Sequence, residues 1–318
     1  MSVRLLGEGL YYMEYEGNDG LDGLLERGGC TTAEELTSYI VSFLTGGHYT
    51  PADTTRASMD YGCSAICVRT PEDSVLMGRN FDFTSATGII LHTIPQKGYE
   101  TYTTFNLKFL GWEPDCFANK YMSLAGLFLA LDGINEKGLA IADLVAGDSV
   151  QTHQQTDKID FTTTSAIVYM LRNAANVEEA LTLLASIDMH SDIGMAHHYA
   201  MADATGRSVV VEYVDNEMVV VEAKAVANHY LCEQKFNVGH IEGDDRYDIL
   251  CNQLASTDSI MSREVLTQTA QSVTQPAKGD FLGTAWTMIM NLTKPSVTYY
   301  SRRDFDTPFH FDFSQKGR

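Results

Sequence analysis

Residues 62–83, GCSAICVRTPEDSVLMGRNFDF, are the stretch that decides the fold of this chain. Their apolar and β-branched residues predict two short strands, Ser64 to Arg69 and Ser74 to Asn80. The turn between them is Thr70-Pro71-Glu72-Asp73, which has the residue types that favour a tight turn. The stretch therefore predicts a β-hairpin whose second strand runs back alongside the first.

This hairpin folds two charged residues back toward a cysteine. Arg79 and Asp82 lie at the end of the second strand, and Cys63 opens the first. A thiol, a cation and a carboxylate in one small space are what cysteine chemistry requires. The alternatives are a buried structural cysteine and a surface ion pair at a strand end.

The same residues resemble the start of the catalytic chain in the cysteine N-terminal-nucleophile (Ntn) hydrolases. That group includes choloylglycine (bile salt) hydrolase, penicillin V acylase and acid ceramidase. Its members begin with Cys-Thr or Cys-Ser and carry Gly-Arg-Asn-x-Asp, which matches residues 78–82 here. The arginine follows Cys63 by 16 positions and the aspartate by 19, as in the family. The resemblance implies an α+β fold, a four-layer αββα sandwich of two antiparallel sheets, with Cys63 on the first strand of one sheet.

The resemblance also implies how Cys63 becomes a nucleophile. Scission between Gly62 and Cys63 would give Cys63 a free α-amine, whose unperturbed pKa of about 7.7 suits a general base. Gly62 permits close approach to its own carbonyl group. By the same resemblance, Arg79 lowers the pKa of the thiol and Asp82 orients the α-amine. Asn80 faces the other side of the strand by alternation and is expected to be structural.

Three later positions match the family pattern or depart from it. Asn228 corresponds to a family asparagine whose amide holds the oxyanion, although Ala227 replaces the threonine before it; the alternative is a turn cap after a strand. Arg246, in Asp244-Asp245-Arg246-Tyr247, matches a family arginine, and the alternative is a solvated loop. Val145 stands where the bile salt enzymes have asparagine, so one oxyanion contact is missing or a backbone N–H replaces it.

The first 62 residues differ from the rest of the chain and are rich in Gly, Glu, Asp and Thr. Thr32-Ala33-Glu34-Glu35 predicts a capping box that opens an amphipathic helix through Leu44, ended by Gly46-Gly47. Such a helix must pack against something. Together with the family resemblance, which implies self-cleavage before Cys63, this leads us to expect residues 1–62 to be a partly helical prosegment and residues 63–318 to be the catalytic domain. The resemblance to acid ceramidase implies that the prosegment can stay bound after cleavage.

Further elements follow from periodicity and capping. The run 132–140, DGINEKGLA, is a family marker that we expect to shape a loop rather than to supply catalytic residues. Other predicted strands are Gly138 to Leu144, His198 to Asp203, Ser208 to Tyr213, Met218 to Ala223, Ala225 to Tyr230, Trp286 to Leu292 and Ser296 to Tyr300. Predicted helices are Thr163 to Asn173, Val177 to Ser186 after Asn176 as N-cap, and Ser262 to Val273. Helices among antiparallel strands suit a layered sandwich.

Composition limits the partners. The chain has 318 residues and a net charge of −20, from 42 acidic and 22 basic side chains, which disfavours nucleic acid and anionic lipid as partners. No apolar run approaches the roughly 20 residues of a membrane span, and the N-terminus has no signal-peptide pattern, so we expect a cytoplasmic protein. The six cysteines form no C-x-x-C pair and are expected to be thiols. No cofactor is expected, and no metal, since the adjacent His197 and His198 would point to opposite faces of a strand.

Together these features predict an amidohydrolase that cuts linear C–N amide bonds in N-acylated small molecules. Two alternatives stay open: an acyltransferase that uses the same thioester, and a non-enzymatic paralogue that binds acyl ligands, which Val145 and Ala227 would favour. The sequence does not choose among bile salts, penicillin V, N-acyl lipids and acylated amino acids. A homo-oligomer also stays open.

Overall fold

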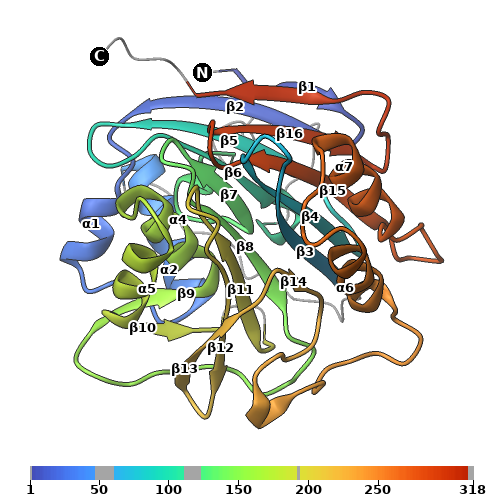
Figure 1. Ribbon diagram of the computed structural model, residues 1–318. Coiled ribbons are helices and arrows are strands. Elements are labelled where there is room, and N and C mark those ends of the chain that lie inside the picture. Colours follow the sequence, from blue (N-terminus) through green and yellow to red (C-terminus); the bar gives the residue numbers. More distant parts are fainter. Residues whose placement is uncertain (1, 47–60, 111–122, 192–193, 314–318) are drawn as a thin grey trace.

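The computed structural model describes residues 2–46, 61–110, 123–191 and 194–313. Two β-sheets pack face to face, and helices cover the outer side of each sheet (Figure 1). The chain therefore has the predicted α+β fold, a four-layer αββα sandwich. None of the helices in the described part of the chain has the length and apolar character that a bilayer crossing requires.

The larger sheet has nine strands within the described residues. Their spatial order is β1 (Arg4–Gly7), β2 (Leu10–Gly17), β5 (Gly88–Pro95), β6 (Thr101–Asn106), β7 (Asp132–Asn135), β8 (Ala140–Val145), β11 (His197–Ala202), β12 (Ser208–Val214) and β13 (Glu217–Glu222). Neighbouring strands in this sheet are antiparallel, except that β2 and β5 are parallel. A separate parallel pair is formed by β9 (Ile159–Thr162) and β10 (Ile187–His190).

The smaller sheet has six strands in the same described ranges. Their order is β14 (Ala225–Val226), β3 (Tyr61–Arg69), β4 (Val75–Phe83), β15 (Gly283–Asn291), β16 (Ser296–Ser301) and β17 (Phe309–Asp312). The hairpin predicted from residues 62–83 is β3 and β4, and it lies in the middle of this sheet. The other predicted strands are also present with ends shifted by three residues at most, with one exception.

The exception is the strand predicted from Ala225 to Tyr230, which is wrong beyond Val226. The backbone of Ala225 and Val226 pairs with β3, whereas the next contact with β3 comes from the side chain of Asn228. The sequence also did not predict β1, β2, β5, β6, β7, β9, β10 and β17. β6 is buried throughout and β5 nearly so, and a strand covered on both faces shows no alternation of apolar and polar residues.

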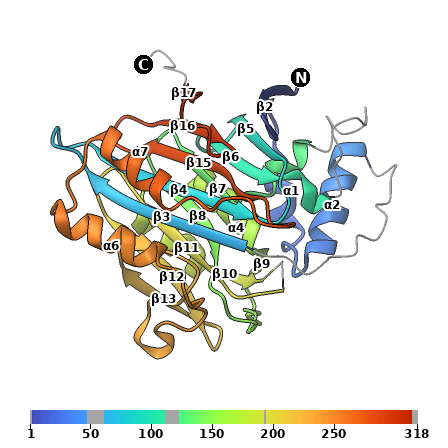
Figure 2. The same ribbon diagram turned by 90° about the vertical axis from the view of Figure 1, so that its right-hand side faces the viewer.

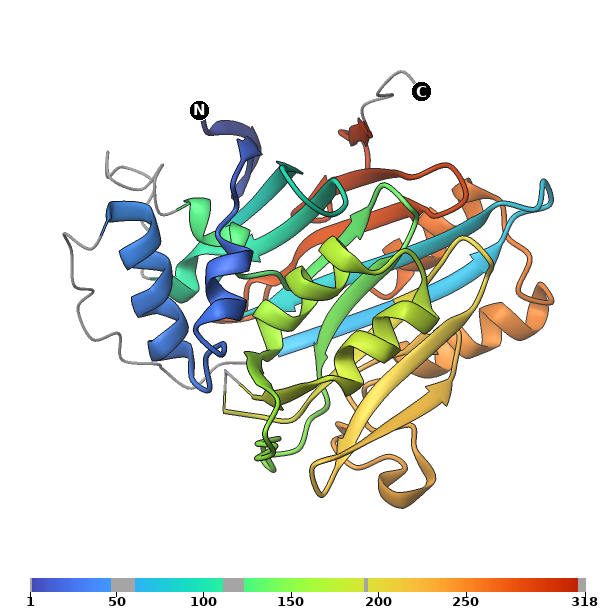
Figure 3. The ribbon, with the colours of Figure 1, turned by 90° about the vertical axis from the view of Figure 1, so that its left-hand side faces the viewer.

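Helices α4 (Thr163–Asn173) and α5 (Val177–Ala185) cover the larger sheet (Figure 3), and α6 (Arg246–Ser256) and α7 (Arg263–Ser272) cover the smaller one (Figure 2). The predicted helices α4, α5 and α7 are present, and Asn176 caps α5 by accepting from the Glu179 N–H at 3.0 Å. Helix α6 was not predicted. Short 3₁₀ turns occur at η1 (Leu107–Leu110), η2 (Ser123–Leu127) and η3 (Glu233–Lys235).

The N-terminal segment is part of the sandwich. It supplies β1 and β2 to one edge of the larger sheet, followed by α1 (Leu21–Glu26) and α2 (Ala33–Thr45) (Figure 3). Thr32 caps α2 as predicted, but the carboxylate of Glu35 accepts from Thr31 rather than Thr32, so the capping box is half formed. Gly46 ends the helix in a left-handed conformation; Gly47 lies outside the described residues.

The two faces of the β3–β4 hairpin have different surroundings. Cys63 and Arg79 lie on the inner face, which packs against the larger sheet. Gly62 and Asp82 are paired across the strands and lie on the outer face, the face that α6 and α7 cover (Figure 2). Because side chains alternate along a strand, the adjacent residues 62 and 63 present opposite faces.

Candidate active site

Cys63 is buried on the inner face, with 3% of its surface exposed. Burial raises the pKa of its thiol, and the positive charge of the Arg79 guanidinium opposes that rise. The structure thus brings together the cysteine and the arginine that the sequence predicted would meet.

Arg79 is fully buried and is held by the larger sheet. Its Nε donates to Asp132 Oδ2 at 3.2 Å, and its Nη2 donates to the backbone oxygen of Asp143 at 2.8 Å. Its Nη1 donates to the backbone oxygen of Asn80. Asp132 also accepts from the indole N–H of Trp286 at 3.0 Å. The family-marker run at 132–140 therefore does more than shape a loop, because its first residue is the counter-ion of Arg79.

Asp82 approaches the cysteine from the other face. Its Oδ2 accepts from Arg246 Nη1 and from Gln275 Nε2, both at 3.0 Å, and its Oδ1 accepts from Thr284 Oγ1 at 2.5 Å. Burial raises the pKa of Asp82, while Arg246, Thr284 and Gln275 oppose the rise. Asp82 shares this face with Asn80, whose amide bonds Thr287 and the backbone of α7, as expected of a structural residue.

Arg246 and Asn228 hold the backbone of Cys63. The N–H of Cys63 donates to Asn228 Oδ1 at 2.6 Å, and the carbonyl of Cys63 accepts from Arg246 Nη1 at 3.0 Å. Arg246 Nη2 donates to the same Asn228 oxygen at 3.0 Å, and Asn228 Nδ2 donates to the backbone oxygen of Val145 at 2.7 Å. Arg246 also pairs with Asp244 at 2.6 Å, so it is a buried part of the site and not a loop charge.

The two adjacent histidines point away from each other, as alternation predicted. His197 Nδ1 bonds the carboxylate of Asp143 at 2.8 Å, and His198 Nδ1 bonds Glu212 at 3.2 Å. In the described ranges, no group of three or more His, Cys, Asp and Glu side chains is arranged to hold a metal ion. Five of the cysteines are free thiols, and Cys116 lies outside the described residues.

The sequence from Cys63 onward matches a known family. Residues 63–282 match the linear amide C-N hydrolases, choloylglycine hydrolase family. The chain belongs to this family. The match begins at Cys63, whose backbone is hydrogen-bonded to Asn228 and Arg246.

Individual relatives are more distant. A penicillin V acylase from Pectobacterium atrosepticum is 24% identical over 164 residues, which are 48% of this chain and 44% of that protein. The chain thus spans less than half the length of this curated relative. Among solved structures, penicillin V acylase from Agrobacterium tumefaciens has a TM-score of 0.58 at 15% identity, covering 80% of this chain and 87% of its own. A variant of the conjugated bile acid hydrolase from Clostridium perfringens has a TM-score of 0.56 at 15% identity, covering 79% and 92%. These structures share the fold.

In this choloylglycine hydrolase family chain, sequence reasoning missed three residues of the site. Asp132, Gln275 and Thr284 each contact a charged residue that the motifs identified. Asp132 carried a signal, since it is an acidic residue at the start of a family-marker run. Gln275 and Thr284 carried none, because only the packing of α7 and β15 against β4 brings them to Asp82.

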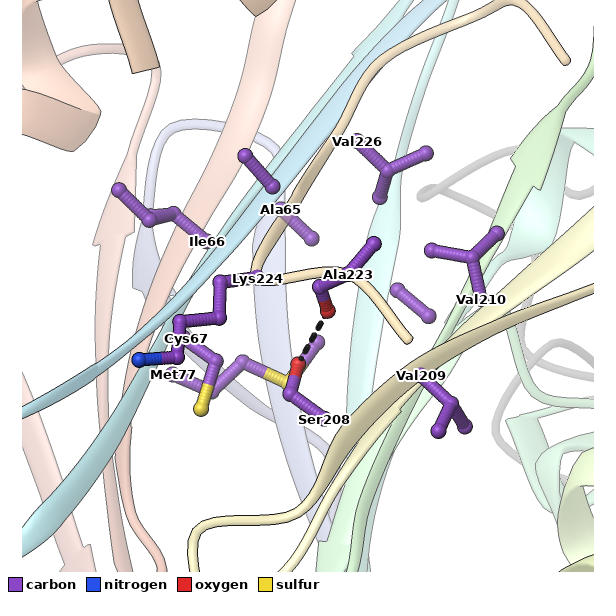
Figure 4. Close-up of a pocket in the computed structure, with 12 residues that line it drawn as sticks. Ala65, Ile66, Cys67, Met77, Ser208, Val209, Val210, Ala223, Lys224 and Val226 are labelled. Atoms are coloured by element: carbon purple, nitrogen blue, oxygen red, sulfur yellow. Dashed lines mark hydrogen bonds between the residues drawn. The ribbon is translucent and has the colours of Figure 1, made fainter. Parts of the chain in front are cut away.

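A small cavity lies between the two sheets, further along β3 from Cys63. It has a volume of about 10 Å³ and is lined by Cys67, Met77, Ser208 and Lys224 together with apolar side chains (Figure 4). The Ser208 hydroxyl donates to the backbone oxygen of Ala223 at 2.8 Å beside it (Figure 4). A volume of this size holds one water molecule and no acyl group, so we assign no substrate to it.

Proposed function

We propose that this chain is a cysteine amidohydrolase that hydrolyses linear amide bonds in N-acylated small molecules. Cys63 is the nucleophile, exposed as an N-terminal residue by scission of the Gly62–Cys63 bond. The observation that carries the proposal is the set of buried charged and amide groups around the backbone of Cys63. A structural cysteine does not need a buried arginine on its carbonyl and a buried asparagine on its N–H, because burying such groups is costly.

The proposed scission uses only groups that are already in place. The Cys63 sulfur attacks the carbonyl carbon of Gly62, the C–N bond breaks, and the nitrogen of Cys63 takes up a proton and becomes an amine. The carbonyl carbon of Gly62 is then joined to the Cys63 sulfur as a thioester, which water hydrolyses to a carboxylate and the free thiol. The new α-amine arises where the Cys63 N–H meets Asn228, with Asp82 and Arg246 alongside.

In turnover, the α-amine acts as the general base for its own thiol. The thiolate attacks the substrate amide, the amine product leaves with a proton from the α-amino group, and water cleaves the thioester. An amide nitrogen carries two hydrogens, so Asn228 can keep its bond to Val145 and still donate to the oxyanion. Arg79 keeps a positive charge next to the sulfur, which favours the thiolate.

We also propose that residues 1–62 remain bound after scission. The support is the extent to which the described part of this segment is built into the sandwich. β2 lies along β5 over the whole length of both strands, and the buried Arg172 of α4 pairs with Asp19. Tyr39 and Phe43 of α2 pack edge-on against Phe128, with ring centroids 5.3 and 5.4 Å away.

Intact mass spectrometry tests the proposal, using the wild type, Cys63→Ala, and Cys67→Ala as a control cysteine on the same face of β3. We expect two fragments divided between residues 62 and 63 in the wild type and in Cys67→Ala, and an intact Cys63→Ala chain. The two fragments should elute together on size exclusion. The cleaved protein is then assayed against a panel of N-acyl amides, with and without an added amine acceptor.

Each outcome has a distinct meaning. Free acid as the product supports hydrolysis, and a new amide that forms only with the acceptor would indicate acyl transfer instead. A wild type that stays intact and inert, as Cys63→Ala does, would rule out the N-terminal nucleophile and favour a chain that only binds acyl ligands.

A further inference from the structure

Gln275 lies beside the bond that the proposed scission breaks. It follows α7 and is fixed to the start of β15 by two reciprocal bonds with Thr284. The N–H of Gln275 donates to Thr284 Oγ1 at 2.8 Å, and the N–H of Thr284 donates to the backbone oxygen of Gln275 at 3.0 Å. The side chain of Gln275 is thereby directed at Asp82, to which its Nε2 donates at 3.0 Å.

Gly62 lies directly under this amide. A methyl group on Gly62 would lie 2.1 Å from Gln275 Nε2 and 2.9 Å from Asp82 Oδ2, which is closer than atoms approach in proteins. Gly62 is not among the residues with positive φ. The space over Gly62 is therefore filled by the Gln275 amide and the Asp82 carboxylate, whereas its backbone conformation is one that other residues adopt.

We propose that Gln275 is a positioning residue for scission of the Gly62–Cys63 bond, holding the ionised carboxylate of Asp82 against the peptide. This inference rests on the function proposed above. Each donor to the Asp82 carboxylate favours its charged form against the effect of burial. Of the three donors, Arg246 also bonds the carbonyl of Cys63, whereas the amide of Gln275 lies against Gly62.

The contact between Gln275 and Gly62 belongs to the uncut chain. Once the bond is broken, Gly62 is free to leave, and the amide and carboxylate that covered it face the new α-amine. The neighbour of Gln275 and Asp82 thus changes with scission, from Gly62 in the uncut chain to the α-amine of Cys63 in the cut chain. A residue with this role should change the rate and the pH dependence of scission more than it changes folding.

The test compares Gln275→Met, which keeps the length of the side chain but removes the donor, with Gln271→Met on the exposed end of α7. Each chain is made by pulsed cell-free translation, and scission is followed on gels from pH 4 to pH 9. We expect Gln275→Met to be cut about tenfold more slowly, the factor for losing one hydrogen bond to a charged group. The acidic side of its profile of scission rate against pH, the acid limb, should move to higher pH, because Asp82 without this donor needs a higher pH to ionise. Gln271→Met should match the wild type.

Two further variants keep the test decisive if Gln275→Met folds poorly. Gln275→Glu also removes the donor and adds a like charge, so its acid limb should move further than that of Gln275→Met. Gly62→Ala displaces the Gln275 amide, so Gly62→Ala/Gln275→Ala should be cut at least as fast as Gly62→Ala alone.

The inference is overturned if Gln275→Met and Gln275→Glu keep the wild-type rate and acid limb. It is also overturned if the fold-decreases in scission rate caused by Gly62→Ala and by Gln275→Ala simply multiply in the double variant. Either result leaves the proposed function intact as long as the wild type is cut. A wild type that is never cut overturns the proposed function and this inference together.

Discussion

The inner and outer faces of the β3–β4 hairpin use charge in different ways, although they meet at the same peptide bond. On the inner face, the cation Arg79 favours the charged form of the Cys63 thiol and is balanced by Asp132 from the opposite sheet. On the outer face, the anion Asp82 accepts hydrogen bonds from Arg246 of α6, from Gln275 after α7 and from Thr284 of β15. The Cys63 thiol and the nitrogen of the Gly62–Cys63 peptide bond therefore lie beside separate networks of charged and hydrogen-bonded groups.

This separation follows from the alternation of side chains along a strand. Residues 62 and 63 are neighbours in sequence, yet Gly62 lies on the outer face beside Gln275 and Asp82, and Cys63 lies between the sheets. A variant on one face should thus disturb one network and leave the other in place.

The largest expected effect is on the inner face. Arg79→Met would leave the buried Asp132 without its counter-ion, which typically costs about 3–5 kcal/mol of stability. The free energy of unfolding is measured by urea titration in a Cys63→Ala background, so that every chain is intact. Adding Asp132→Asn should restore part of the loss. Arg69→Met at the other end of the hairpin, where the pair with Asp73 is exposed, should cost less than about 1 kcal/mol. Equal losses for the two arginines would contradict a separate inner network.

Much of this arrangement could be predicted from the sequence. The hairpin, the positions of Arg79 and Asp82 in it, and the layered fold follow from the pattern of residues 62–83 and from its resemblance to a known family. Asn228 and Arg246 followed from the same resemblance, and both contact the backbone of Cys63. The roles of these residues in chemistry stay predictions.

The rest depends on contacts that no local pattern encodes. Gln275 and Thr284 reach Asp82 only because β15 pairs with β4 in one register, across about 200 residues of sequence. Strand β2 pairs with β5 in parallel, which nothing in the first 62 residues indicates. Helix α6 begins at Arg246 after a run of acidic residues that resembled a loop, and the side chain of that arginine is directed inward to Asp82 rather than to water.

A smaller effect is expected on the outer face, where two threonines of β15 offer a matched pair. Thr284 donates to Asp82 at 2.5 Å, and Thr287 donates to the structural Asn80 at 2.6 Å. Thr284→Val should slow scission about tenfold, because it removes a hydrogen bond to a buried carboxylate. Thr287→Val removes a bond between neutral groups, so it should cost about 1 kcal/mol of stability and leave scission near the wild-type rate. Scission that slows equally in both variants, followed on gels, would mean that the outer face acts only through folding.

The smallest expected effect compares two thiols on the inner face. Cys67 lies four residues beyond Cys63 on the same face of β3, and burial raises the pKa of its thiol from 9.0 to about 11. The folded chain therefore keeps this proton while the unfolded chain loses it, so the stability from the neutral thiol is full below pH 9 and declines as pH rises toward 11. A difference of one full proton between the two states costs roughly 1.4 kcal/mol per pH unit, and from pH 9 to pH 10 the two states differ on average by about 0.7 of a proton. In a Cys63→Ala background, the advantage of Cys67 over Cys67→Ala should therefore shrink by about 1 kcal/mol between pH 9 and pH 10, as measured by urea unfolding. Buried tyrosines titrate in both proteins and cancel in the difference. A constant advantage across this range would mean that Cys67 ionises as easily as an exposed thiol, and that the inner face needs no guanidinium to support a thiolate.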